Sequence, residues 1–167
     1  MQKTEKNIKI LGIYQIIGGI LGTALTLYFS GKAGILNFPI LKMTIVFLSF
    51  YSFSIYCGIL LVKKNYVRGL NLSIINQILQ IISFSVLGFT FAYTSGMFIS
   101  FGLNLTTDTL LTYNMGLTTF NFKWNADPEY AAVSINIIAL ILLNVSFNLK
   151  EKITKGQKDE LSEIGQS

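Results

Sequence analysis

The chain of 167 residues is 51% hydrophobic and 13% charged, and its mean hydropathy is +0.56. A typical soluble domain carries about 25% charged residues, and here the few charges gather in short clusters separated by long uncharged stretches. This pattern is typical of a polytopic membrane protein, and it excludes a soluble enzyme of ordinary composition.

The inventory of reactive side chains argues against catalysis. The chain has no histidine, which is the usual acid/base group at neutral pH and the commonest metal ligand. Its single cysteine, Cys57, has no second thiol with which to form a disulfide or a thiolate metal site. The basic residues flank apolar runs, so they are interpreted as determinants of membrane topology and not as a nucleic-acid surface. We therefore expect no enzyme, no catalytic residue, no metal, no cofactor and no nucleic-acid partner.

Four uncharged runs are each long enough to cross a bilayer as a helix. A bilayer core needs about 20 predominantly apolar residues, and such runs cover residues 10–29, 43–62, 69–88 and 130–149. The first run follows three lysines, but it exceeds the roughly 7–15 residues of a signal-peptide apolar region, and no A-x-A-like site follows it. The sequence therefore predicts a single integral membrane domain, residues 1–167, built as an all-α bundle of four transmembrane helices.

The distribution of Lys and Arg predicts the orientation. With four spans, the N-terminus, the connection near residues 63–69 and the tail 150–167 share one side, and they hold ten of the thirteen basic residues. Loops rich in Lys and Arg stay on the cytoplasmic side, so both termini are expected there. The Ile-, Asn-, Lys- and Phe-rich composition is typical of an AT-rich bacterial genome, which favours a bacterial inner membrane. The tail is expected to be solvated and partly disordered beyond Ile153.

Two of the predicted spans carry polar or small residues at helical spacing, and none carries an ionisable side chain. The stripe in the first span consists of Gly12, Gln15, Gly18, Gly19, Gly22 and Thr26, and the stripe in the third consists of Ser73, Asn76, Gln80 and Ser83. Steps of three and four residues keep each set on one helix face. The absence of intramembrane charge argues against a proton relay or a voltage sensor.

Three interpretations of these stripes stay open. The two stripes could face each other and hold the bundle together, as small and polar residues often do between membrane helices. Alternatively, Gln15, Asn76 and Gln80 could line a polar conduit or cleft. A third possibility is that Gly18 and Gly22, which form a G-x-x-x-G motif, make a homo-oligomer contact.

The segment 89–129, between the third and fourth predicted spans, changes from helical to alternating periodicity. Apolar and polar residues alternate through residues 89–124, which is typical of half-buried strands. We expect a small antiparallel meander of three or four strands here, with Ser95-Gly96 as a turn, forming an extracytoplasmic cap. Its apolar face could pack on the helices or bind a partner, with Tyr113, Phe120, Phe122 and Trp124 as candidate contact residues.

These features predict a small polytopic membrane protein without catalytic activity. The favoured function is that of an accessory, sensor or scaffold subunit which recognises a protein partner through the cap. The alternative is a small oligomeric channel or carrier for an uncharged or weakly charged solute. The expected partners are the lipid bilayer and either a second protein or further copies of the chain.

Overall fold

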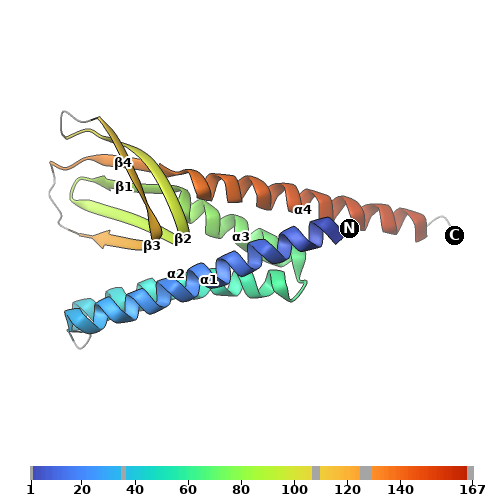
Figure 1. The fold of residues 1–167 in the computed structure, drawn as a ribbon, viewed down its shortest axis with the longest axis horizontal. Coiled ribbons are helices and arrows are strands. Elements are labelled where there is room, and N and C mark those ends of the chain that lie inside the picture. The colour runs from blue at the N-terminus through green and yellow to red at the C-terminus, as the bar shows by residue number, and fades with distance from the viewer. Residues whose placement is uncertain (1, 35–36, 107–109, 125–128, 165–167) are drawn as a thin grey trace.

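The computed structural model describes residues 2–34, 37–106, 110–124 and 129–164, with side chains described as far as residue 156. Four helices and four strands follow in chain order (Figure 1): α1 (Gln2–Ala33), α2 (Phe38–Val62), α3 (Tyr66–Ile81), β1 (Ile82–Val86), β2 (Phe89–Asn104), β3 (Leu111–Lys123), β4 (Ala132–Asn136) and α4 (Ile137–Ile164).

The two predicted spans at 69–88 and 130–149 are not membrane-length helices. The first changes from helix to strand at Ile82, and the second includes β4 and becomes helical only at Ile137. Among the described residues, only α1 and α2 are long and apolar enough to cross a membrane. The prediction of an all-α bundle of four transmembrane helices is therefore wrong, because a four-stranded sheet occupies much of the C-terminal half.

Both of these changes between helix and strand have a local cause. From Ile82 onward, apolar residues alternate with Ser83 and Ser85, which is the period of a strand and not of a helix. At the other junction, Asn136 Oδ1 accepts hydrogen bonds from two backbone N–H groups in the first turn of α4, at 3.1 and 3.4 Å. Such an N-cap favours the start of a helix at this point. A mean hydropathy does not register either signal, because it ignores the order of residues.

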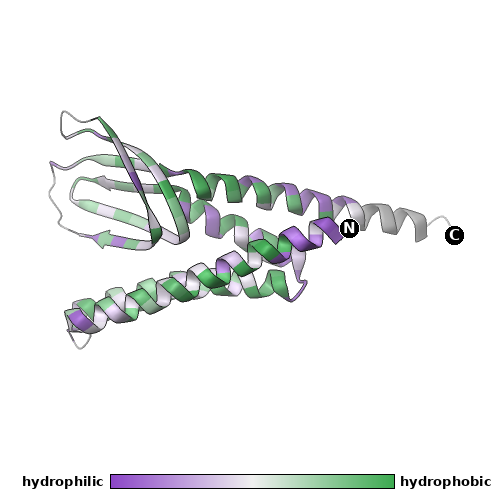
Figure 2. Cartoon of the chain, viewed as in Figure 1, coloured by the Kyte–Doolittle hydropathy of each residue, from purple (hydrophilic) through white to green (hydrophobic). Residues whose placement is uncertain are grey.

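Helices α1 and α2 form an antiparallel pair whose backbones approach closely. A Cβ atom added to Gly12 would lie 2.9 Å from the carbonyl oxygen of Gly58, so both positions need a residue without a side chain. Near the other end of the pair, Thr44 Oγ1 donates a hydrogen bond to Ser30 Oγ at 2.7 Å. Hydrophobic residues run along most of both helices (Figure 2). The sheet lies beside the ends joined by the α1–α2 connection, and α3 and α4 lead from the sheet toward the termini (Figure 1).

The sheet is antiparallel and curls on itself. Its strand order is β1-β4-β2-β3, and β1 also pairs with the beginning of β2. Strand β2 therefore contacts β1 near Phe91 and β4 near Phe101, so that β1, β4 and β2 form a closed ring of pairings. Strand β3 pairs along nearly the whole of β2 and has no neighbour on its other side among the described strands.

The predicted meander within residues 89–129 is wrong in its composition. This segment supplies two long strands, β2 and β3, whereas β1 and β4 come from the runs that were expected to be helical spans. The expected turn at Ser95-Gly96 is a β-bulge inside β2, where the register shifts between Thr94 and Met97. A bulge bends and twists its strand, which allows β2 to reach both β1 and β4.

The two faces of the curled sheet have opposite polarity. On the convex face, three cross-strand pairs have side chains that are 49–77% exposed: Met97 with Leu117, Phe101 with Tyr113, and Leu103 with Leu111. On the concave face, hydroxyl and amide side chains converge, as at the pair of Ser100 and Asn114. The part of the convex face that lies nearest α2 is covered. There, the rings of Phe47 and Phe50 pack on the ring of Phe120, with centroid distances of 3.9 and 5.6 Å.

Helix α4 extends much further than expected for the tail. It continues to Ile164, although the sequence predicts a solvated, partly disordered end beyond Ile153. Glu151 and Lys155, one helical turn apart, form an ion pair of 2.7 Å that lowers the pKa of the Glu151 carboxyl, and such pairs favour a helix. The apolar part of α4 joins α1, α2 and α3 in a core cluster of Ile8, Leu11, Leu61, Leu70 and Leu149.

Candidate functional site

The polar stripes expected on the first and third spans meet in a buried hydrogen-bonded network. Gln15 of α1 and Ser73, Asn76 and Gln80 of α3 are each at most 5% exposed. Ser73 Oγ donates to Gln15 Oε1 at 3.1 Å, and Asn76 Nδ2 donates to Ser54 Oγ of α2 at 3.2 Å. The network therefore joins three helices through neutral side chains.

The bulge of β2 completes this network. Ser95 N–H donates to Gln80 Oε1 at 2.8 Å, and Ser95 Oγ donates to Ser54 Oγ at 2.9 Å. The hydroxyl of Tyr93 lies 3.0 Å from the Phe50 carbonyl oxygen and 3.3 Å from Asn76 Oδ1. Sequence reasoning missed Tyr93, Ser95 and Ser54 as members of the network. The only sequence signal was a glycine within an alternating strand pattern, which often marks a bulge.

The glycines of α1 pack against this chain's own residues. A Cβ at Gly18 would lie 2.6 Å from Gly96 N, and one at Gly22 would clash with the ring of Tyr51. Gly19 faces Ile55 and Tyr51 in the same way, and Thr26 is 8% exposed. The face that carries the G-x-x-x-G motif is therefore covered by α2 and β2, which leaves no room for a second copy at these glycines.

Two amide side chains in this region keep unpaired atoms. Gln77 is 1% exposed, and neither its Nε2 nor its Oε1 has a hydrogen-bond partner among the described residues. Gln15 Nε2 is also buried without a partner. Buried amides without partners destabilise a fold, so these groups mark the least satisfied part of the helix interface.

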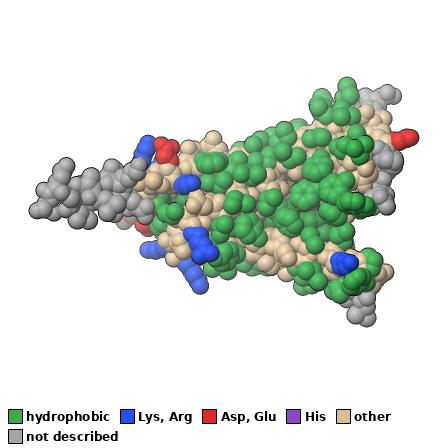
Figure 3. Space-filling view, turned by 180° about the vertical axis from the view of Figure 1, so that it is seen from behind, with side chains coloured by type: hydrophobic (Ala, Val, Ile, Leu, Met, Phe, Trp, Pro, Cys, Tyr) green, Lys and Arg blue, Asp and Glu red, His purple; other side chains and the backbone are tan. Residues whose placement is uncertain are grey.

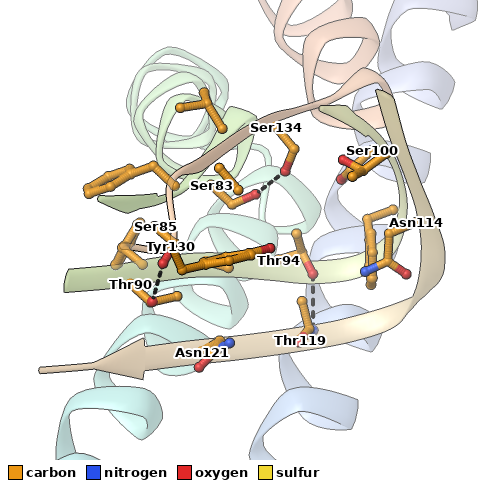
Figure 4. Close-up of a pocket in the computed structure, with 17 residues that line it drawn as sticks. Ser83, Ser85, Thr90, Thr94, Ser100, Asn114, Thr119, Asn121, Tyr130 and Ser134 are labelled. Carbon is orange, nitrogen blue, oxygen red and sulfur yellow. Dashed lines mark hydrogen bonds between the residues drawn. The ribbon is translucent and has the colours of Figure 1, made fainter. Parts of the chain in front are cut away.

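Ser83, the last residue of the second predicted stripe, lies elsewhere. Because the helix ends at Ile81, Ser83 belongs to β1, where its hydroxyl lies 2.6 Å from Ser134 Oγ of β4. Both residues line a cavity of about 330 Å³ on the concave face of the sheet (Figure 4). Its polar lining consists of Ser83, Ser85, Thr90, Thr94, Ser100, Thr112, Asn114, Thr119, Asn121, Tyr130 and Ser134. We call this cavity the polar trough.

The four candidate contact residues of the cap divide into two groups. Tyr113 and Trp124 are 56% and 73% exposed. Phe120, in contrast, packs on Phe47 of α2, and Phe122 is half-buried with its ring edge-on to Phe89 at 5.1 Å between centroids. Phe120 and Phe122 therefore take part in packing inside the chain, and of the four only Tyr113 and Trp124 are open to a partner.

No family model, curated protein or solved structure matches this chain. Among the described residues, no group of three or more His, Cys, Asp or Glu side chains lies close enough to hold a metal ion.

Proposed function

We propose that this protein is an integral membrane protein that acts as a non-catalytic accessory subunit, and that it recognises its partner by strand pairing along β3. In this proposal α1 and α2 cross the bilayer, and the curled sheet lies beside them toward the extracytoplasmic side. The observation that carries the proposal is the outer edge of β3, to which no strand among the described residues pairs, and whose residues 111–117 also present exposed apolar side chains.

The surface of α1 and α2 supports membrane insertion. Only 39% of the most apolar window of α1 and 33% of that of α2 are buried, whereas a core helix of a soluble protein is mostly buried. At about 1.5 Å per residue, 32 and 25 residues span roughly 48 and 38 Å, and a hydrocarbon core is about 30 Å thick. Exposed hydrophobic side chains cover most of one face of the molecule, and basic side chains gather toward one end (Figure 3). That end is proposed to face the cytoplasm.

The edge of β3 supports recognition of an extended peptide segment. A free strand edge presents backbone N–H and C=O groups that readily pair with another chain. Soluble proteins protect such edges with charges, but residues 111–117 contain none. Within the hydrocarbon core of a bilayer, unpaired backbone groups are strongly disfavoured because no water is present to satisfy them. The occupant that fits is therefore an uncharged, apolar, extended segment of a second protein.

The test is purification from native membranes in a mild detergent, followed by intact mass measurement. The wild-type chain should retain a second protein at a fixed stoichiometry, and Met115→Lys should lose it, because a charge on this edge opposes pairing. Leu105→Lys is the matched control, since Leu105 is 64% exposed but lies beyond the end of β2 and away from the edge of β3. Equal retention by both variants, or a monomer without any partner, would contradict the proposal.

The alternative, a small oligomeric channel or carrier, requires the polar network to conduct. Gln15, Asn76 and Gln80 donate or accept hydrogen bonds within the network, which favours a packing role for these side chains. A homo-oligomer with no second protein bound would overturn the accessory-subunit proposal and favour this alternative. Solute flux into proteoliposomes would then be the next measurement.

A further inference from the structure

The polar trough is a half-open cavity with the size of a small-molecule site. Residues of all four strands and Tyr130, just before β4, surround a volume of about 330 Å³. Ligand pockets typically measure roughly 300–1,000 Å³, so the trough suits a ligand at the small end of this range. Figure 4 shows Tyr130 lying across the trough between the β1–β4 side and the β2–β3 side.

The lining is uncharged and mixes polar groups with apolar side chains such as Phe84, Phe91 and Phe98. Eleven of its seventeen residues carry a hydroxyl or carboxamide group, and no acidic or basic side chain is among the described residues that line it. A charged ligand would therefore have no counter-ion in the trough. A purely apolar ligand would leave many donors and acceptors without partners, which is unfavourable.

Part of the lining is already paired, and part is available. The Ser85 and Thr90 hydroxyls lie 2.7 Å apart, and Thr94 Oγ1 accepts from the Thr119 N–H at 3.0 Å. By contrast, the carboxamides of Asn114 and Asn121 make no hydrogen bond to any other part of the chain that the structure describes, although both line the trough. A carboxamide offers two donors and an acceptor with two lone pairs. The wall formed by β3 therefore presents two such groups to a ligand.

Hydroxyl and amide groups beside an aromatic ring match the chemistry of a neutral sugar. A sugar ring presents hydroxyls around its edge, which exchange hydrogen bonds with amides and hydroxyls, and C–H groups on its face, which pack on an aromatic ring. Tyr130 supplies the ring, and Asn114 and Asn121 supply bidentate partners. We infer that the polar trough binds a single neutral sugar ring, either of a free saccharide or of a glycolipid headgroup.

Binding is measured on the full chain in nanodiscs or in an amine-oxide detergent, because detergents with glycoside headgroups would compete for the trough. The probes are methyl glucoside, methyl galactoside and methyl N-acetylglucosaminide, together with nanodiscs that contain monoglucosyl or digalactosyl diacylglycerol. Glucose 6-phosphate and phosphatidylglycerol are the charged comparators. We expect saturable binding of at least one neutral probe, by saturation-transfer NMR or by a rise in Tm, and weaker binding of the comparators.

Variants connect this binding to the trough. Asn114→Ala should weaken it by about tenfold, a typical effect of losing hydrogen bonds to a ligand, and should leave the Tm of the free protein unchanged. Tyr130→Ala should also weaken it, and Tyr130→Phe should retain most of it because the ring remains. Asn71→Ala is the matched control, since Asn71 is exposed on α3.

The outcomes are distinct. Binding of the glycolipid nanodiscs without binding of methyl glycosides identifies the headgroup as the source, and binding of both identifies the sugar ring itself. The inference is overturned if no neutral probe binds, if the charged comparators bind equally well, or if Asn114→Ala binds as tightly as Asn71→Ala. These outcomes do not require the partner proposed at β3, because the probes contact side chains on the concave face, whereas that partner would pair with the backbone at the outer edge of the strand.

Discussion

Gly18→Ala tests the close approach of α1 to the bulge of β2. The added Cβ would lie 2.6 Å from Gly96 N and 2.7 Å from the carbonyl carbon of Ser95, whereas ordinary contacts begin near 3.4 Å. Both atoms belong to the backbone, so no side chain can rotate away to make room. The bulge is also held by the hydrogen bonds of its two N–H groups to Gln80 and Thr118, at 2.8 and 3.0 Å. The helix and the sheet must therefore separate by about 0.8 Å.

Two opposing terms determine the size of this effect. Overpacking of a well-packed contact typically lowers the free energy of unfolding by about 1–3 kcal/mol. Replacing glycine by alanine within a helix raises it by at most about 1 kcal/mol. We expect a net loss of about 1–2 kcal/mol, because the backbone of the bulge is fixed from both sides. Gly31→Ala is the matched control: nothing lies within 4 Å of a Cβ at Gly31, so only the favourable helix term applies.

The single cysteine provides the assay. Cys57 is 0% exposed, so a thiol-reactive fluorescent maleimide reports its exposure as the protein unfolds on heating. For chains of this size, about 1–2 kcal/mol corresponds to a fall in Tm of roughly 2–8 °C. Gly18→Ala should melt lower than the wild type by this amount, and Gly31→Ala should melt at the same temperature or higher. A Gly18→Ala variant as stable as Gly31→Ala would refute the packing of α1 on the bulge.

Three further outcomes are expected. Tyr93→Phe removes the hydroxyl that contacts Phe50 and Asn76, and should lower the free energy of unfolding by about 1–3 kcal/mol. Tyr113→Phe, at an exposed position, is the control and should have little effect. Equal losses of stability in the two variants would contradict the role of Tyr93 in the buried network. Gln77→Leu should leave the Tm unchanged or raise it, because both amide atoms are buried without partners; a marked fall would show that the amide is satisfied. The fluorescence of Trp124, the only tryptophan, should be quenched more by lipids brominated near the headgroup than by lipids brominated near the chain ends, because tryptophan favours the interface. If neither lipid quenched this fluorescence, the placement of the sheet at the membrane would be contradicted.

The polar stripes illustrate what helical periodicity predicts well. Gln15, Ser73, Asn76 and Gln80 lie close together because the parts of α1 and α3 that carry them are helical, as the spacing indicates. Ser83 departs from this pattern for a definite reason. It is two residues beyond the end of α3, and in a strand its side chain points toward Ser134 of β4 and not toward the helices.

The sheet illustrates what local patterns do not predict. Alternation indicates strands in residues 89–124, but Ser95-Gly96 has the composition of a turn, and only the pairing of β2 with both β1 and β4 makes it a bulge. The polar trough depends on the same pairings, because its walls come from segments up to about 50 residues apart. No window of sequence contains that information.

The sequence by itself determined the solvent preferences of the chain: its apolar runs, its lack of intramembrane charge, the clustering of its basic residues and the alternation of its strands. These properties depend on each residue and its near neighbours. The local signals at Ile82 and Asn136 indicate where two of the four apolar runs change between helix and strand. Only the tertiary structure decided that these strands pair with β2, and that the sheet curls into a trough with β3 at its edge among the described strands. The physical reason is that a strand is stabilised by backbone hydrogen bonds to a distant segment, whereas a helix forms its hydrogen bonds within itself.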